Sequence, residues 1–215
     1  MITHESIDAL RAELESKKDS GLMSEKRFVH TVEVEKMAAR IARIYAPEKE
    51  LILRTAALLH DITKEFSFEL QIKLCAQYGL DICKTDYHAP KTLHARTAAE
   101  VIKEEYPELA EAEVVSCVRW HTTGRAGMTL CEKIVYLADY IDMSRKFEDC
   151  VRLREYFFGK DISNMSDDEK MTHLDSTLLI SFDMTISGLL EKKAPISFDT
   201  IAARNELAVK LIERA

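Results

Sequence analysis

The sequence contains few of the residues that interrupt helices. Glycine occurs 6 times and proline 4 times among 215 residues. A sheet of many strands needs a turn after each short strand, and most turns depend on these residues. No run of the chain alternates convincingly between polar and apolar residues over the length of a strand. The sequence therefore predicts an all-α fold.

Long apolar runs and closely paired cysteines are also missing. No stretch approaches the roughly 18–20 apolar residues that cross a bilayer, and the charged N-terminal segment lacks the apolar core of a signal peptide. The cysteines form no C-x-x-C pair, and their odd number indicates buried free thiols in a reducing compartment. We therefore expect a cytoplasmic protein that does not enter membranes. The five cysteines are Cys75, Cys83, Cys117, Cys131 and Cys150.

Positive charge is in the minority. The chain has 30 lysines and arginines against 37 acidic residues, which gives a formal net charge of −7. This balance argues against direct electrostatic binding to nucleic acid or anionic lipid, because both carry dense negative charge. A small anionic substrate is compatible with it, since a local basic pocket can form on an acidic protein.

Apolar periodicity and capping signals divide the chain into helices. The words "TLCE" at 129–132 and "SDDE" at 166–169 have the spacing of capping boxes, which satisfy free N–H groups at a helix start. We expect one domain over residues 1–215, a helical bundle at about 20–158 with C-terminal helices at about 159–215 packed on it. The expected helices cover about 3–17, 25–45, 47–62, 67–79, 92–106, 107–121, 129–141, 166–194 and 199–213, with 80–91 irregular.

Four histidines and two aspartates fall on or at the ends of successive expected helices. A helical bundle builds an interior metal site from such side chains. Each alone is more often an ordinary core or surface residue, and the neighbours His60 and Asp61 point about 100° apart on a helix. They can share an ion only near a helix end, which "ITK" at 62–64 allows. The six residues are His30, His60, Asp61, His94, His121 and Asp139.

Three longer words carry a family resemblance: "RFVHTVEV" at 27–34, "AALLHDITK" at 56–64 and "HTTGRAGMTLCEKIVYLADYID" at 121–142. In the order H…HD…H…H…D, they resemble the HD-domain superfamily of metal-dependent phosphohydrolases. Within it the chain is similar to the YqeK family, bacterial proteins that hydrolyse diadenosine tetraphosphate symmetrically. The resemblance extends from about residue 26 to 145. Met143 and the word "ARTAAE" depart from the family pattern without replacing a ligand.

The resemblance implies a dinuclear centre. His30, His60, Asp61 and Asp139 would hold one metal ion, and His94 and His121 the second, with Asp61 bridging both. The family favours iron, whereas nitrogen and oxygen donors also suit manganese, cobalt, nickel or zinc. A hydroxide bridging the two ions would attack a central phosphate, so that diadenosine tetraphosphate gives two ADP. The expected partners are thus a dinucleoside polyphosphate and ADP or GDP as product or analogue.

Basic residues near these words are candidates for offsetting phosphate charge. We expect Asp61, Lys64 and Arg125 to take part in catalysis, with Lys64 and Arg125 also contacting the substrate. Gly124 and Gly127 would let the "TTGRAG" loop approach a phosphate closely. Tyr87 and Tyr140 are both candidates for stacking on a nucleobase, and the sequence does not choose between them. The expected substrate contacts are Arg27, Lys64, Thr123, Gly124, Arg125, Lys133 and Arg145.

Two other readings remain open. An HD nucleotidase or cyclic-dinucleotide phosphodiesterase acts on a different nucleotide, and a mononuclear nucleotidase needs only H…HD…D, which would leave His94 and His121 spare. A catalytically silent nucleotide-binding regulator would keep the fold without turnover. The sequence also leaves homodimer formation open. His4 and His173 are expected on the surface, and His88 in a loop.

Overall fold

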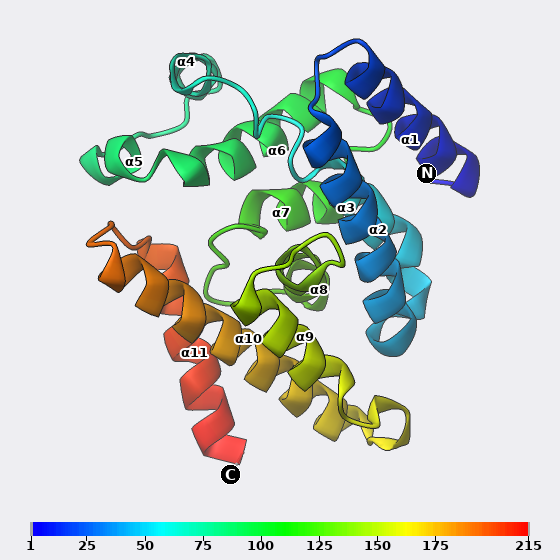
Figure 1. Ribbon diagram of the computed structural model, residues 1–215, viewed down its shortest axis with the longest axis vertical. Helices are drawn as coiled ribbons and strands as arrows, with labels where there is room; N and C mark the ends of the chain where they lie inside the picture. The colour runs from blue at the N-terminus through cyan, green and yellow to red at the C-terminus, as the bar shows by residue number, and fades with distance from the viewer. Residues whose placement is uncertain (1, 215) are drawn as a thin grey trace.

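Helices form the whole of the regular structure in residues 2–214, the part of the chain that this computed structural model describes. No strand occurs among these residues, so the all-α prediction is confirmed (Figure 1). The α-helices are α1 (His4–Asp19), α2 (Glu25–Tyr45), α3 (Glu50–Leu59), α4 (Phe68–Gln77), α5 (Lys84–His88), α6 (Leu93–Glu105), α7 (Ala112–Trp120), α8 (Leu130–Ile141), α9 (Glu148–Phe158), α10 (Asp167–Glu191) and α11 (Phe198–Arg214). Short 3₁₀ turns are η1 (Pro47–Lys49), η2 (Pro90–Thr92) and η3 (Ile162–Asn164).

Helix α8 lies at the centre of the bundle (Figure 1). It packs against α2, α3, α7, α9 and α10, and residues on all its sides are buried. A helix that is apolar over most of its surface is stable only when other elements surround it. Its capping box forms as expected, with Thr129 accepting from the backbone N–H of Glu132. This central position brings Asp139, near the end of α8, beside α2 and α3.

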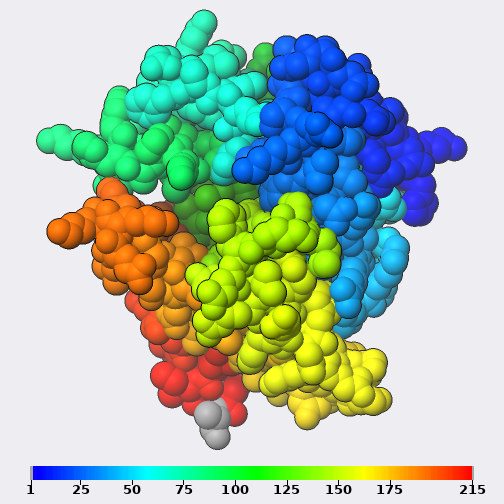
Figure 2. Space-filling model, viewed as in Figure 1, coloured from blue at the N-terminus to red at the C-terminus, as the bar shows by residue number. Residues whose placement is uncertain are grey.

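The C-terminal helices share the core of the bundle. Leu174, Leu178 and Phe182 of α10 are fully buried in the same hydrophobic cluster as the residues of α2, α3 and α8. The ring of Phe182 packs on that of Tyr136 in α8, with 4.7 Å between the ring centroids. Figure 2 shows the C-terminal residues, orange to red, packed against the yellow-green residues near position 150 on the visible face.

Several helix boundaries differ from those expected. Helix α3 ends at Leu59, three residues earlier than predicted, and α7 begins at Ala112 because residues 107–109 form a turn. Helix α9 was not predicted, since its N-cap is Phe147, which makes no capping bond. The short helix α5 lies in the segment predicted to be irregular.

Two predictions about burial were wrong. Cys83 is exposed, whereas the other four cysteines are buried; all five are free thiols. His173 is buried, with its ring stacked on that of Phe157 at 5.3 Å and its Nε2 3.0 Å from the carbonyl oxygen of Phe157. In residues 2–214 no helix combines the length and the apolar character that crossing a membrane requires.

Candidate metal centre

His60 and Asp61 lie in the turn that follows the last residue of α3. The carbonyl groups at a helix end have no partner within the helix, and the Nδ1 of His60 lies 2.6 Å from the carbonyl oxygen of Ala57. Because the helix stops here, the two neighbouring side chains converge. The Nε2 of His60 is 3.3 Å from Oδ2 of Asp61.

Two further histidines are held in the same way. His121 follows the last residue of α7, and its Nδ1 lies 2.7 Å from the carbonyl oxygen of Val118. His94, in the first turn of α6, places its Nδ1 2.8 Å from the carbonyl oxygen of Lys91. A carbonyl accepts only from a protonated nitrogen, so each ring carries its proton on Nδ1 and presents the lone pair of Nε2 to the centre. A hydrogen bond of this kind fixes the tautomer and orientation of a metal-binding histidine.

His30 uses side chains instead of a carbonyl. Its Nδ1 lies 3.3 Å from Oδ2 of the fully buried Asp142 and 3.4 Å from the hydroxyl of Ser144. Ser144 also donates its backbone N–H and its hydroxyl to Oδ1 of Asp142. Sequence reasoning missed Asp142 and Ser144. The signal was the second carboxylate of "DYID", Asp142, which lies three residues after Asp139 and directly follows the last residue of α8.

Asp61 divides the site into two groups of donors. Its Oδ2 is 3.3 Å from Nε2 of His60 and 3.6 Å from Nε2 of His30. Its Oδ1 is 3.0 Å from Nε2 of His94 and 3.5 Å from Nε2 of His121. One carboxylate therefore presents one oxygen to each pair of imidazoles.

Asp139 joins the group of donors around His30 and His60, and the rings of His94 and His121 contact each other in the second group. Oδ1 of Asp139 is 3.0 Å from Nε2 of His30 and 3.8 Å from Nε2 of His60. The Nε2 atoms of His94 and His121 are 3.0 Å apart. All six predicted ligands thus lie in one cluster, and its donor atoms are close enough to hold a metal ion in the sets His30–His60–Asp139 and His60–Asp61–His121.

The donor atoms fit a bound cation. The Nε2 atom of His60 and the Oδ1 atom of Asp61 are buried without a hydrogen-bond partner. Leaving a buried polar atom unpaired is unfavourable by about 1–3 kcal/mol, and two such atoms lie in this cluster. Nitrogen and oxygen donors without sulfur suit first-row transition metals. The residues present therefore fit the metal that the sequence predicts.

The electrostatics keep most of these groups in the forms that bind metal. Burial lowers the pKa of His94 to about 4, and burial also lowers the pKa of His121. Burial disfavours ionisation of Asp61, but His60, His121 and His94 outweigh it and hold its pKa well below the usual value. For His30 burial is likewise outweighed, here by Asp139 and Asp142, and its pKa rises to about 9. A metal ion at His30 therefore replaces a proton.

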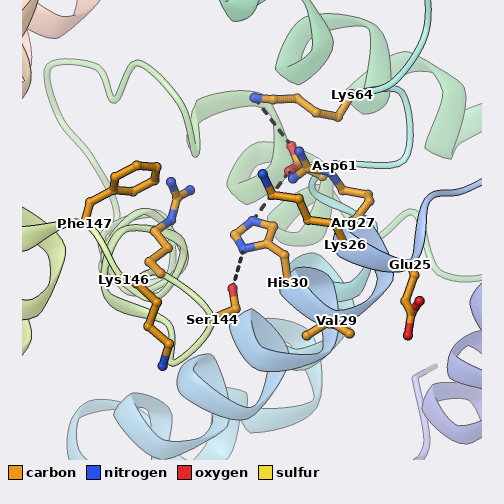
Figure 3. Close-up of a pocket in the computed structure, with 11 residues that line it drawn as sticks. Glu25, Lys26, Arg27, Val29, His30, Asp61, Lys64, Ser144, Lys146 and Phe147 are labelled. Atoms are coloured by element: carbon orange, nitrogen blue, oxygen red, sulfur yellow. Dashed lines mark hydrogen bonds and ion pairs between the residues drawn. The ribbon is translucent and has the colours of Figure 1, made fainter.

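A pocket of about 880 Å³ opens over the centre. In Figure 3, His30 lies between Asp61 and Ser144, and Lys64 and Arg27 approach Asp61. Arg145 pairs with Asp139. The cationic lining thus forms a basic patch on an acidic protein, as the sequence allowed. Its members are Lys26, Arg27, Lys64, Arg145 and Lys146.

The loop after His121 packs inward. Thr123 is buried, and its carbonyl accepts from the hydroxyl of Thr200. Gly124 has φ +63°, and a Cβ there would lie 2.6 Å from Cζ of Phe182. Arg125 pairs with the buried Glu132 at 3.0 Å. None of the three is among the residues lining the pocket, so contacts between this loop and a phosphate stay a prediction.

Lys133 is also held away from the pocket. Its ammonium pairs with the fully buried carboxylate of Asp175, which Lys210 approaches to 2.8 Å from the other side. This arrangement argues against a phosphate contact at Lys133, because a carboxylate already neutralises the charge inside the protein. Sequence reasoning missed two lysines that line the pocket, Lys26 and Lys146.

Comparison with known proteins identifies the family. The model of the HD domain family matches residues 27–144, a range that includes all six predicted ligands. The chain belongs to the HD domain family. The symmetrical bis(5'-nucleosyl)-tetraphosphatase of Halalkalibacterium halodurans is 30% identical over 87% of this HD protein and 92% of its own length. The enzyme of the same name from Bacillus subtilis is 29% identical over 86% and 91%.

A crystal structure shows the same fold. It is that of a predicted HD superfamily hydrolase involved in NAD metabolism from Clostridium acetobutylicum, which is 29% identical and has a TM-score of 0.76, covering 98% of this HD protein and 99% of its own chain. The prediction of a YqeK-type HD domain is confirmed by the family match and these relatives. With its cluster of histidine and aspartate donors, the HD protein is a metal-dependent phosphohydrolase.

Proposed function

We propose that this HD protein hydrolyses diadenosine tetraphosphate into two molecules of ADP with the help of two metal ions. The observation that carries the proposal is Asp61, whose two oxygens face two different pairs of imidazoles at the floor of a cation-lined pocket. Relatives named symmetrical bis(5'-nucleosyl)-tetraphosphatase, similar over most of their length, support the choice of substrate.

The donor groups suggest how two ions are held. Oδ2 of Asp61, His30, His60 and Asp139 would bind one ion, and Oδ1 of Asp61, His94 and His121 the other. When bound, two such ions supply a lowered pKa for a water molecule and a Lewis acid for phosphoryl oxygens. Iron is our proposal for their identity, with manganese, cobalt, nickel or zinc compatible with the same donors.

The basic side chains of the pocket bind and orient the phosphates. Arg27 and Arg145 contact Asp61 and Asp139 directly, so a phosphate group bound beside these carboxylates meets both guanidinium groups. Lys64 reaches the His94 side of the centre, with Nζ 3.1 Å from Nε2 of that ring. Fixed positive charge around the reacting phosphate offsets the negative charge that develops in the transition state. The leaving ADP is a stable anion, so no strong general acid is required.

Product analysis tests the proposal. Protein of measured metal content is incubated with diadenosine tetraphosphate in ¹⁸O-labelled water. The product nucleotides are then separated, and their masses are measured by mass spectrometry. ADP should be the only product, with one ¹⁸O in half of the molecules. ATP together with AMP would contradict symmetrical cleavage. An inactive protein that binds ADP with every metal tried would instead support a silent regulator.

Metal stoichiometry separates the proposal from a mononuclear nucleotidase. We expect about two ions per chain, because the two oxygens of Asp61 face different pairs of imidazoles. A value near one, with activity on nucleoside monophosphates, would leave His94 and His121 without a role as ligands. His94→Ala provides the matched variant, and it should lose one ion and retain the other.

A further inference from the structure

One exposed aromatic side chain lies at the mouth of the pocket. Phe147 is 72% exposed and lines the same pocket as His30 and Asp61 (Figure 3). In this view its ring lies on the opposite side of the pocket from Glu25. Tyr87 and Tyr140, the two aromatic residues that the sequence offered as base-stacking candidates, are not among the lining residues.

The fold gives no reason for an aromatic residue here. Phe147 is the N-cap of α9 and makes no capping hydrogen bond. Ser, Thr, Asp and Asn are preferred at this position because their side chains accept from free N–H groups. Phe147 also leaves most of its ring in water, where burial would stabilise the protein. What distinguishes Phe147 from other exposed apolar residues is that it lines the pocket, where its ring is available to contact a ligand.

Its place in the chain matches the layout of a nucleotide. Ser144 contacts His30, Arg145 pairs with Asp139, and Lys146 and Phe147 follow as lining residues. The segment 145–147 is not helical and leads outward from the metal centre to α9. In a nucleoside polyphosphate, the ribose and then the base lie progressively further from the phosphates. Phe147 is likewise further along the chain from the metal centre than Arg145, which pairs with a predicted ligand. A substrate whose reacting phosphate lies at the ligands thus directs a base toward Phe147.

We propose that the ring of Phe147 binds a purine base of the substrate by stacking. The inference rests on the proposed function, which places the phosphates at the metal centre. Aromatic side chains stack on nucleobases through their faces, and the interaction does not depend on hydrogen-bonding groups. Because phenylalanine has no such groups, Phe147 increases affinity for large flat bases and leaves the choice between adenine and guanine to other residues.

Replacing Phe147 tests the proposal. Phe147→Ala should raise KM for diadenosine tetraphosphate and Kd for ADP by about 5- to 150-fold, the range measured for loss of one stacked base. Inhibition by inorganic diphosphate, which has no base, should stay within about twofold of the wild type by the same reasoning. Phe198→Ala is the matched control, since Phe198 is 85% exposed and lies outside this pocket.

A second variant gives a direct signal. Phe147→Trp should keep the KM of the wild type, and its added fluorescence should be quenched by ADP and unaffected by diphosphate. Unchanged KM and Kd in Phe147→Ala would overturn the stacking proposal, as would equal losses for ADP and diphosphate. Binding of ADP by a wild-type protein that does not cleave diadenosine tetraphosphate would contradict the proposed function while leaving the stacking test valid.

Discussion

Asp142 should set the affinity of one half of the metal centre. Its carboxylate is fully buried, and Oδ2 lies 3.3 Å from Nδ1 of His30. In Asp142→Asn an amide of nearly the same size replaces the carboxylate, so packing is kept while the negative charge is lost. Loss of such a partner behind a ligand weakens metal binding by about 10- to 100-fold, which corresponds to about 1.4–2.7 kcal/mol.

A metal titration measures this effect. Metal-free protein is titrated with Mn²⁺ against a chelating dye, and two binding phases are expected. In Asp142→Asn only the phase of the His30 group should shift, because His94 and His121 are oriented by the backbone carbonyls of Lys91 and Val118.

The control is another buried carboxylate. Asp175→Asn changes a fully buried aspartate that pairs with Lys133 and Lys210, outside the centre. It should lower the free energy of unfolding and leave both binding phases unchanged. Identical metal affinity in Asp142→Asn and the wild type would refute the idea that Asp142 orients His30. An equal shift of both phases would refute the division of the ligands into two groups.

Four other variants or treatments follow from the structure. Asp61→Asn should reduce kcat by at least about 100-fold, as loss of a key electrostatic group does; normal turnover would exclude Asp61 from the mechanism. Removing metal with a chelator should abolish activity and lower Tm by about 5–10 °C for each ion removed, relative to protein at a metal concentration of 100 times Kd, which calorimetry measures. Lys133→Met should destabilise the protein by about 3 kcal/mol in urea unfolding with kcat and KM unchanged, whereas raised KM would restore a substrate role. Gly124→Ala should destabilise by at least about 2 kcal/mol because of its positive φ and the ring of Phe182, and unaltered stability would contradict the packed loop.

Sequence reasoning works best where the signal is local. The capping boxes at Thr129 and Ser166 begin α8 and α10 as expected, because three residues suffice to specify them. It fails at α9, whose N-cap Phe147 carries no start signal, and at Cys83, whose exposure depends on how α5 lies against the rest. These features are decided by tertiary packing, which periodicity alone does not encode.

The sequence predicted the candidate metal ligands better than the residues that surround them. The ordered series from His30 to Asp139 and the family words identified side chains that the fold brings into one cluster. The sequence did not predict in the same way which lysine side chains line the pocket. Lys133 lies six residues before Asp139 and Lys146 seven residues after it. Of these two, Lys146 lines the pocket, whereas Lys133 pairs with Asp175, 42 residues further along the chain.

The positions at which α3 and α7 end determine how the imidazoles of His60 and His121 are oriented. In a helix that continued, the carbonyls of Ala57 and Val118 would accept hydrogen bonds from the backbone N–H groups four residues ahead. The two imidazoles would then lose the carbonyl oxygens that accept from their Nδ1–H groups. One residue inserted into α3 before Ala57 would turn every later side chain by about 100° about the helix axis. Tolerance to insertions and deletions should therefore be lowest in these two helices. For this protein, where a helix stops is part of how the candidate metal ligands are oriented.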